Sequence, residues 1–359
     1  MLRRTAHLGR STRRFAGIGL AVALGLALQA PGASAHGGGR PLGGHRHTDN
    51  GFAPNAPWNT KLPANVPLAP NSAAIVANLA QDKAQNFGSW AINTDTYSAP
   101  IYYVGRNTPR LHWTFSDCLN MPQLAPVIAD TLASVPTPPG MLVSQGTDAS
   151  VAIYQPSTDT YWDFWRAGQD ANGNWSACWG GKIEHYTTNP GIFANPLGAT
   201  ATGLPFGAFM IRVDELRRGR IDHAINLVTV RTRANCFSWP ASRDDGNTPG
   251  ADIPCEGQRF RLDPAFDVNT LRDPAARIIA KAMQEYGLIL TDKGGAVVTY
   301  AEDPRPFAAR DGGVDPYDLL FDPTGTYPET VSRYAVLADL PIDRLQALPL
   351  DYGEPGPGH

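Results

Sequence analysis

Residues 158–181 read TDTYWDFWRAGQDANGNWSACWGG and set the expected fold. The segment holds four of the eight tryptophans of the chain, and Ala171-Asn172-Gly173-Asn174 separates its two aromatic runs. Asn and Gly tolerate the positive φ angles that tight turns need. Aromatic runs on both sides of such a turn are typical of a β-hairpin, so the segment predicts two antiparallel strands.

The two faces of the first strand differ in chemistry. Side chains of a strand alternate between faces, so Tyr161, Asp163 and Trp165 share one face, opposite Trp162 and Phe164. Because a carboxylate is costly to bury in an apolar core, we expect the face of Asp163 to line a groove. Rings beside a carboxylate suit a groove that stacks sugars. The alternative is that the N-terminal arm and the C-terminal tail cover this face.

The first 35 residues have the pattern of an export signal. Five arginines precede an apolar run from Phe15 to Ala30, and Ala33-Ser34-Ala35 is a small-residue cleavage site. We expect cleavage after Ala35 and a secreted protein. Without the five arginines, 33 acidic residues stand against 25 basic ones. This balance argues against nucleic acid and against a membrane surface as partners, and we expect a monomer.

Four cysteines in an exported chain predict two disulfide bonds. The favoured pairing is Cys236–Cys255, which closes a loop rich in Pro, Asp and Gly, with Cys118–Cys178 as the second bond. No pair has the C-x-x-C spacing of a zinc site. Nucleotide-binding loops and the H-E-x-x-H and G-x-S-x-G motifs are also missing from the sequence. We therefore expect no metal and no cofactor.

Gly and Pro make up about a fifth of the chain, which favours short strands separated by turns over long helices. The clearest helix begins at Pro274 after the capping residue Asp273 and ends before Gly287. Other helices are expected at 72–87, 122–132 and 342–347. Strands are expected at 100–104, 110–115, 150–155, 160–166, 176–186, 207–213, 222–230, 258–262, 288–291 and 296–300.

This order of elements predicts a mainly β protein, an antiparallel β-sandwich of jelly-roll type with a few peripheral helices. Residues 36–70 are expected to form a flexible arm rich in Gly, His and Pro. Residues 71–359 are expected to form one sandwich domain with a wrapping C-terminal tail.

Several acids on predicted strands are candidates for chemistry. Hydrolysis of a glycosidic bond usually needs two carboxyl groups, one of them protonated. The candidates are Asp163, Glu184 in KIEHY, Glu215 at the end of AFMIRVDEL, and Asp292 before a Gly-Gly turn. For Asp292 the alternative is a turn acid that bonds the backbone. The expected sugar-binding rings are Tyr161, Trp165 and Trp175.

A histidine and two arginines suggest a different reaction. His223 shares its face with Ile221 and Ile225, so it is either a buried structural residue or a general base. Arg259 and Arg261 lie two residues apart on one face and could clamp a carboxylate. Such a clamp with His223 as base would suit β-elimination of a uronic-acid polymer. The alternative for the arginines is cross-strand ion pairing.

Several motifs between residues 145 and 300 occur in a fixed order: ATGLP at 201–205, IRVDEL at 211–216, GRIDHA at 219–224, GQRFRL at 257–262, and QEYG followed by TDKGG at 284–295. Together they resemble a family of exported bacterial proteins without an assigned activity. The resemblance implies one recurring unit of fold that is jelly-roll-like and carbohydrate-active, and it names no reaction. It marks Cys236 and Cys255 as an addition to the family pattern.

The leading hypothesis from the sequence is a secreted glycoside hydrolase that acts on an extracellular polysaccharide through an aromatic groove with a pair of carboxylates. A polysaccharide lyase and a carbohydrate-binding protein without catalysis are the alternatives. Elimination leaves a double bond that absorbs ultraviolet light, whereas hydrolysis does not, so the products distinguish the two reactions.

Overall fold

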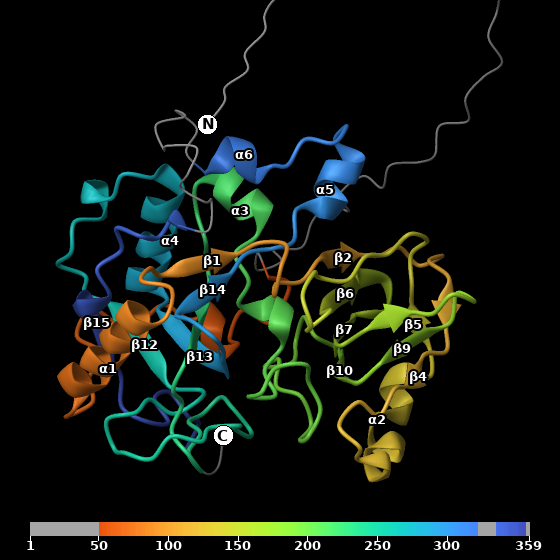
Figure 1. Ribbon diagram of the computed structural model, residues 1–359, viewed down its shortest axis with the longest axis horizontal. Coiled ribbons are helices and arrows are strands. Elements are labelled where there is room, and N and C mark those ends of the chain that lie inside the picture. The colour runs from red at the N-terminus through yellow and green to blue at the C-terminus, as the bar shows by residue number, and fades with distance from the viewer. Residues whose placement is uncertain (1–49, 322–334, 357–359) are drawn as a thin grey trace, which may run out of the picture. The chain divides into compact units, whose positions relative to one another are not determined.

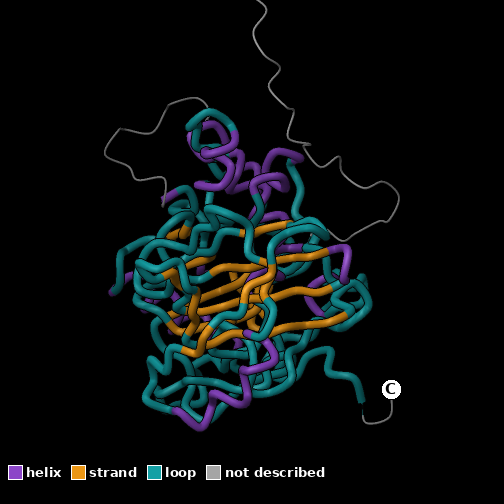
Figure 2. Tube along the Cα trace, turned by 90° about the vertical axis from the view of Figure 1, so that its right-hand side faces the viewer, coloured by secondary structure: helices purple, strands orange, loops and turns teal. Residues whose placement is uncertain are grey.

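The structure is a computed structural model, and it describes residues 50–321 and 335–356 (Figure 1). The predicted signal peptide and the first part of the predicted arm lie outside the described residues. The described residues belong to one compact unit. Within the range predicted as an arm, Phe52 and Trp58 are buried. The strands lie together in the middle of the molecule with helices and loops around them (Figure 2).

A four-stranded sheet contains the aromatic hairpin. Its strand order is β10-β7-β6-β2. The strands are β2 (Ile101–Tyr103), β6 (Val151–Gln155), β7 (Thr160–Trp165) and β10 (Trp179–Glu184). Two small sheets lie beside it: β3 (Arg110–Leu111) with β5 (Val135–Pro136), and β4 (Thr114–Phe115) with β9 (Trp175–Ala177) and β8 (Gly168–Gln169).

A six-stranded mixed sheet forms the second large layer, in the order β1-β14-β11-β13-β12-β15. Its strands are β1 (Ala91–Asn93), β11 (Ile225–Thr229), β12 (Arg259–Leu262), β13 (Leu288–Lys293), β14 (Val298–Tyr300) and β15 (Leu345–Ala347). The helices α1 (Ser72–Gln85) and α4 (Pro274–Glu285) contribute Ile75, Leu79, Ile279 and Met283 to the core against this sheet.

The prediction of a mainly β protein is confirmed, because sheets dominate and helices are few. The antiparallel jelly roll is not confirmed. The pairs β1 with β14, β11 with β13, and β2 with β6 are parallel. Parallel neighbours need long crossovers, and such crossovers leave no local signal in the sequence.

The remaining helices are short. They are α2 (Ala125–Leu132), α3 (Val213–Arg218), α5 (Arg305–Arg310) and α6 (Tyr317–Leu320). Single 3₁₀ turns lie at Pro57–Asn59, Pro122–Leu124, Pro156–Thr158, Phe206–Ala208, Val268–Thr270 and Ile342–Arg344. The predicted cap of α4 is present, since the Asp273 carboxylate accepts hydrogen bonds from the N–H groups of Ala275 and Ala276.

Two element predictions are wrong. Residues 207–213 were expected as a strand, but a 3₁₀ turn and the start of α3 occupy them. The reason is the cap of α3, where Glu215 Oε2 accepts a hydrogen bond from the N–H of Arg212 at 2.9 Å. Residues 342–347 were expected as a helix, but a single 3₁₀ turn leads there into β15.

Both faces of β7 are buried. On one face Tyr161 packs against Phe52 of the N-terminal segment, with ring centroids 5.1 Å apart. On the other face Phe164 packs against Trp113, with ring centroids 4.5 Å apart. The N-terminal segment therefore covers the Tyr161 end of the face that was expected to line a groove.

Both predicted disulfides are present, Cys118–Cys178 and Cys236–Cys255. Within residues 50–321 and 335–356, no helix combines the length and the apolar character needed to cross a membrane.

Candidate active site

A pocket of about 1240 Å³ lies between the two large sheets. Strands of the six-stranded sheet supply apolar side chains, including Ala91, Val228 and Val298. The four-stranded sheet supplies Trp165 and Trp179 from the adjacent ends of β7 and β10. Loops supply Asp148, Asp244 and Asp245 to the lining, and β13 supplies Asp292.

The aromatic wall of the pocket follows from strand register. Trp165 and Trp179 are direct cross-strand partners, so their side chains emerge on the same face of the sheet. The indole N–H of Trp165 donates to Asp148 at 3.2 Å, and that of Trp179 donates to the carbonyl of Pro196 at 3.1 Å. These hydrogen bonds orient both indoles in the pocket wall.

Asp292 is the acid in the pocket with the most perturbed environment. It lies in β13, and one of its carboxylate oxygens accepts a hydrogen bond from the N–H of Lys293 at 2.8 Å. The pKa of Asp292 is raised to about 7, mainly by burial and also by the nearby carboxylates of Asp245 and Asp148. Asp292 therefore holds a proton in a large fraction of molecules near neutral pH, which suits a general acid.

Asp245 lies beside a buried acid, Glu256. The N–H of Asp245 donates to Glu256 Oε2 at 3.2 Å, and Glu256 is fully buried. Burial, followed by the hydrogen bond to the Asp245 side chain, raises the pKa of Glu256 to about 9. Glu256 is therefore protonated at neutral pH.

The cationic side chains of the pocket lining are bound to the protein itself. Arg243 donates to the main-chain carbonyls of Pro196, Leu197, Gly198, Thr200 and Ala201. The Nζ of Lys293 donates to the carbonyl of Asp245 at 2.7 Å and lies 3.4 Å from its carboxylate. Asp148 and Asp244 also line the pocket and bring negative charge.

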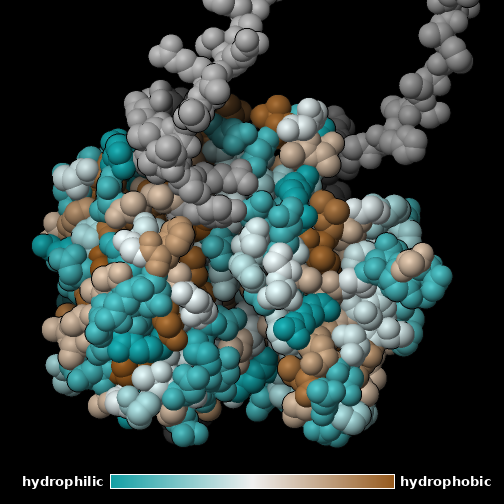
Figure 3. Space-filling model, in the orientation of Figure 1, coloured by the Kyte–Doolittle hydropathy of each residue, from teal (hydrophilic) through white to brown (hydrophobic). Residues whose placement is uncertain are grey.

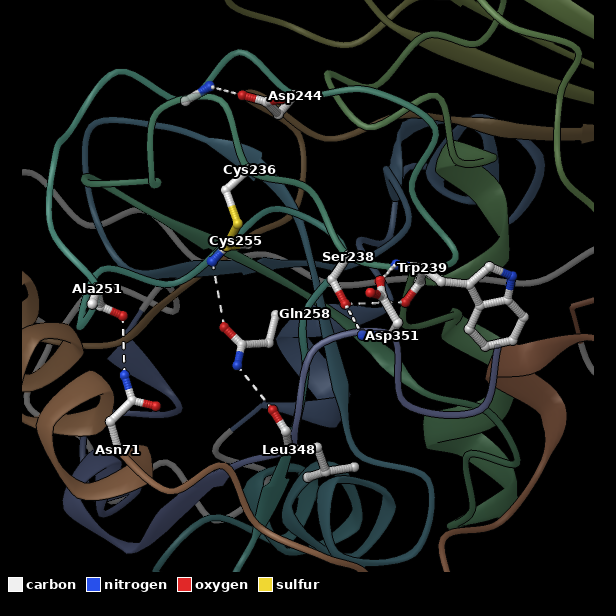
Figure 4. The surroundings of a disulfide bond; sticks show 11 residues. Asn71, Cys236, Ser238, Trp239, Asp244, Ala251, Cys255, Gln258, Leu348 and Asp351 are labelled. Carbon is white, nitrogen blue, oxygen red and sulfur yellow. Dashed lines mark hydrogen bonds between the residues drawn. A yellow bond between two sulfur atoms is a disulfide. The ribbon is translucent and has the colours of Figure 1, made fainter. Parts of the chain in front are cut away.

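The loop that carries Arg243, Asp244 and Asp245 is closed by the Cys236–Cys255 disulfide (Figure 4). Gln258 anchors the base of this loop, because it accepts from the N–H of Cys255 and donates to the carbonyl of Leu348. The disulfide and Gln258 thus hold the acidic wall of the pocket in place.

Asp163 does not face the pocket, and the prediction that it lines a groove is wrong. It is fully buried, and its carboxylate accepts hydrogen bonds from the N–H of Ala199 at 3.1 Å, the N–H of Phe206 at 2.9 Å and the hydroxyl of Tyr161 at 3.1 Å. Burial raises its pKa to about 7. These bonds hold the loop 196–206, which forms another wall of the pocket.

Glu215 and His223 come together, but in the core rather than in the pocket. His223 Nε2 lies 3.0 Å from Glu215 Oε1, and Nδ1 donates to the carbonyl of Ala224 at 2.8 Å. The imidazole beside it is the main factor that lowers the pKa of Glu215 against the effect of burial. This pair ties α3 to the segment before β11.

Arg259 and Arg261 are also structural. Arg259 is buried and donates to the carbonyls of Pro57, Thr60 and Tyr286. Arg261 donates to Gln346 and to the carbonyls of Pro63 and Ala64. No cross-strand carboxylate pairs with either arginine among the described ion pairs.

The other predicted residues are dispersed. Glu184 is exposed at the far end of β10, where it pairs with Lys182 at 3.0 Å. Trp175 is buried and stacks on Trp113. Of the sequence-predicted catalytic and binding residues, the pocket therefore brings together Trp165 and Asp292.

Sequence reasoning missed Asp148, Asp244 and Asp245. All three lie in loops, and the candidate acids were sought mainly on strands. A signal was present, since Arg243-Asp244-Asp245-Gly246 is a charged run inside a disulfide-closed loop, and loops carry binding and catalytic groups more often than strands do.

Within the part of the chain that the structure describes, no group of three or more His, Cys, Asp or Glu residues is arranged to hold a metal ion. Comparisons with protein families, with curated proteins and with solved structures find no match for the chain. Its function is therefore argued from the geometry of the pocket.

Proposed function

We propose that this protein is a secreted glycoside hydrolase that cleaves an extracellular polysaccharide in the pocket between the two sheets. The observation that carries the proposal is Asp292, a carboxyl group with a pKa raised to about 7 that lines an aromatic pocket together with Asp148. Glycoside hydrolases combine one protonated and one ionised carboxyl group beside the scissile bond.

The lining of the pocket supports a sugar as ligand. Trp165 and Trp179 offer adjacent rings, and such rings stack on the apolar faces of sugars. Asp148 and Asp244 offer carboxylate oxygens to sugar hydroxyls. Because Arg243 and Lys293 are bound to the protein, the lining favours a neutral glycan over a uronic-acid polymer.

Asp292 is the general acid in this proposal. Its proton passes to the glycosidic oxygen as the bond from that oxygen to the anomeric carbon breaks, so the leaving group departs as a neutral alcohol. Asp148 is the second carboxylate, oriented by the indole N–H of Trp165. It stabilises the positive charge that develops at the sugar ring. It either bonds to the anomeric carbon and is then displaced by water, or takes a proton from a water molecule that attacks that carbon, and in both cases the hydroxyl of water ends on the sugar.

Secretion, with signal cleavage after Ala35, is part of the same proposal. Two disulfide bonds support it, because disulfides persist in oxidising compartments outside the cytosol.

The test is a screen of neutral and acidic polysaccharides with the full chain, read by reducing ends and by ultraviolet absorbance. We expect new reducing ends without absorbance, and we expect Asp292→Asn to reduce the rate at least about 100-fold, as loss of a general acid does. The control is Asp170→Asn, because Asp170 is exposed in the turn between β8 and β9 and lies outside the pocket. The rate should fall as the pH rises through about 7, since Asp292 must be protonated.

Other results would contradict the proposal. Products that absorb ultraviolet light would indicate a lyase, and retention of a glycan without cleavage would indicate a binding protein. Equal rates for the Asp292→Asn variant and the wild type would exclude Asp292 as the acid even if hydrolysis occurs.

A further inference from the structure

The rim of the pocket is apolar and exposed. Phe87, Tyr97, Leu119 and Met121 line the pocket, with exposed fractions of 65%, 42%, 47% and 39%. They come from three segments that are far apart in the sequence, the end of α1, the loop after β1 and the loop before α2. On the face that Figure 3 shows, brown apolar patches interrupt a mostly polar surface.

The backbone holds two of these rings in unusual conformations. Phe87 and Tyr97 have φ angles of 72° and 56°, in the left-handed region that residues with bulky side chains rarely adopt. The ring of Tyr97 lies against Gly146, where an added methyl carbon would be 2.8 Å from the ring. Strained conformations of this kind cluster at ligand-binding sites, where the surroundings enforce them.

A disulfide fixes the aliphatic part of the rim. Cys118 precedes Leu119 and is bonded to Cys178, which precedes Trp179 of the aromatic wall. The rim and the sugar-stacking wall are thereby tied together. Asp117 and Asn120 on both sides of Leu119 also have positive φ angles, 39° and 54°.

Leucine and methionine side chains offer no hydrogen bond to a sugar. At Leu119 and Met121 a plain polysaccharide would lose hydration of its hydroxyl groups without gaining hydrogen-bond partners, which is unfavourable. An apolar chain would instead cover the rim, and its burial is favourable. The rim is continuous with the pocket that contains Trp165 and Asp292.

We propose that the ligand of this pocket is an amphiphilic glycoconjugate, with a sugar against Trp165 and Trp179 and an aliphatic chain against the rim of Phe87, Tyr97, Leu119 and Met121. The sugar end rests on the proposed function, whereas the aliphatic end rests on the rim alone. An experiment can therefore contradict the sugar part of the proposed ligand without contradicting the aliphatic part, and the reverse.

The experiment is a calorimetric titration of the full chain with methyl, hexyl and octyl glucoside, each below its micelle concentration. Burial of each methylene should raise the affinity by about fourfold. This dependence on chain length does not require that glucose is the natural sugar. We expect Phe87→Ser and Leu119→Ser to reduce the gain between hexyl and octyl glucoside by at least about fivefold.

Matched controls are present on the same chain. Phe237 and Leu350 are exposed to similar fractions, 49% and 42%, and lie outside the pocket. Phe237→Ser and Leu350→Ser should leave the dependence on chain length unchanged. Thermal unfolding of all four variants separates loss of binding from loss of fold.

Three results would overturn the inference: equal affinity for all three glucosides, a chain-length dependence that survives in both rim variants, or a dimer in sedimentation that Phe87→Ser dissociates. The dimer would mean that a second copy covers the rim. Chain-length-dependent binding without cleavage of any polysaccharide would instead contradict the proposed hydrolysis and leave the amphiphilic ligand standing.

Discussion

Gly181→Ala should displace the loop 196–206, which forms one wall of the pocket, although Gly181 does not line the pocket itself. Gly181 in β10 lies opposite Asp163 in β7, under the loop that forms one wall of the pocket. A methyl carbon added there would lie 2.4 Å from Cε1 of Phe193 and 2.8 Å from the backbone nitrogen of Gly198. Both distances are too short for non-bonded contacts, so the loop has to move.

The expected loss of stability combines two effects. Overpacking in a dense core costs about 1–3 kcal/mol. The N–H of Gly198 also donates to the carbonyl of Gly180 at 3.0 Å, and breaking that bond costs about 1 kcal/mol. We therefore expect Gly181→Ala to lower the free energy of unfolding by about 3 kcal/mol.

Urea denaturation, followed by tryptophan fluorescence, measures this loss. The control is Gly168→Ala in β8, because a methyl carbon there would meet no atom within 4 Å. In a Phe193→Ala background, Gly181→Ala should cost less than it does in the wild type, because the ring contact is gone and only the contact with Gly198 remains. If Gly181→Ala and Gly168→Ala have the same stability, the loop does not pack so closely on Gly181 that a side chain is excluded there.

Three further predictions concern the walls of the pocket. Asp163→Asn should cost about 2 kcal/mol in urea denaturation, because the amide can accept from only one of the N–H groups of Ala199 and Phe206. Replacing Cys236 and Cys255 together by serine should cost about 3 kcal/mol, the entropy of a loop that spans 19 residues. Wild type and variant should have equal stability once both are treated with reductant, because reductant opens Cys118–Cys178 in both proteins. The raised pKa of Glu256 gives stability that is fully present below its unfolded pKa near 4.5 and is lost as the pH rises through about 9. Glu256→Gln should flatten that part of the dependence of unfolding free energy on pH, and an unchanged slope would contradict the protonated state of Glu256.

Local signals predicted local structure well. The alternation of residues 160–165 predicted β7, the cap at Asp273 predicted α4, and the number of cysteines with their flanking residues predicted both disulfides. In each of these cases the determining interaction is local or is chemically restricted to a few partners.

Predictions that depend on distant partners did not hold. The alternation in β7 separates two faces, but it cannot show that Phe52 covers the face of Tyr161. The four acids of the pocket, at 148, 244, 245 and 292, come from three segments far apart in the chain, and the packing of the two large sheets brings them together. Their proximity is therefore a property of tertiary packing that a pattern in one sequence does not contain.

A raised pKa does not by itself identify a catalytic acid in this protein. Burial raises the pKa of three carboxyl groups, Asp163, Asp292 and Glu302, to about 7. Asp163 uses its oxygens to hold the loop 196–206, and Glu302 is buried and accepts from the N–H of Val213 at the start of α3. Asp292 alone among these three also lines the pocket. A proton on Asp292 can therefore reach a bound molecule, whereas a proton on Asp163 or Glu302 stays within the protein. Access, more than the size of the pKa shift, is the reason to propose Asp292 as the general acid.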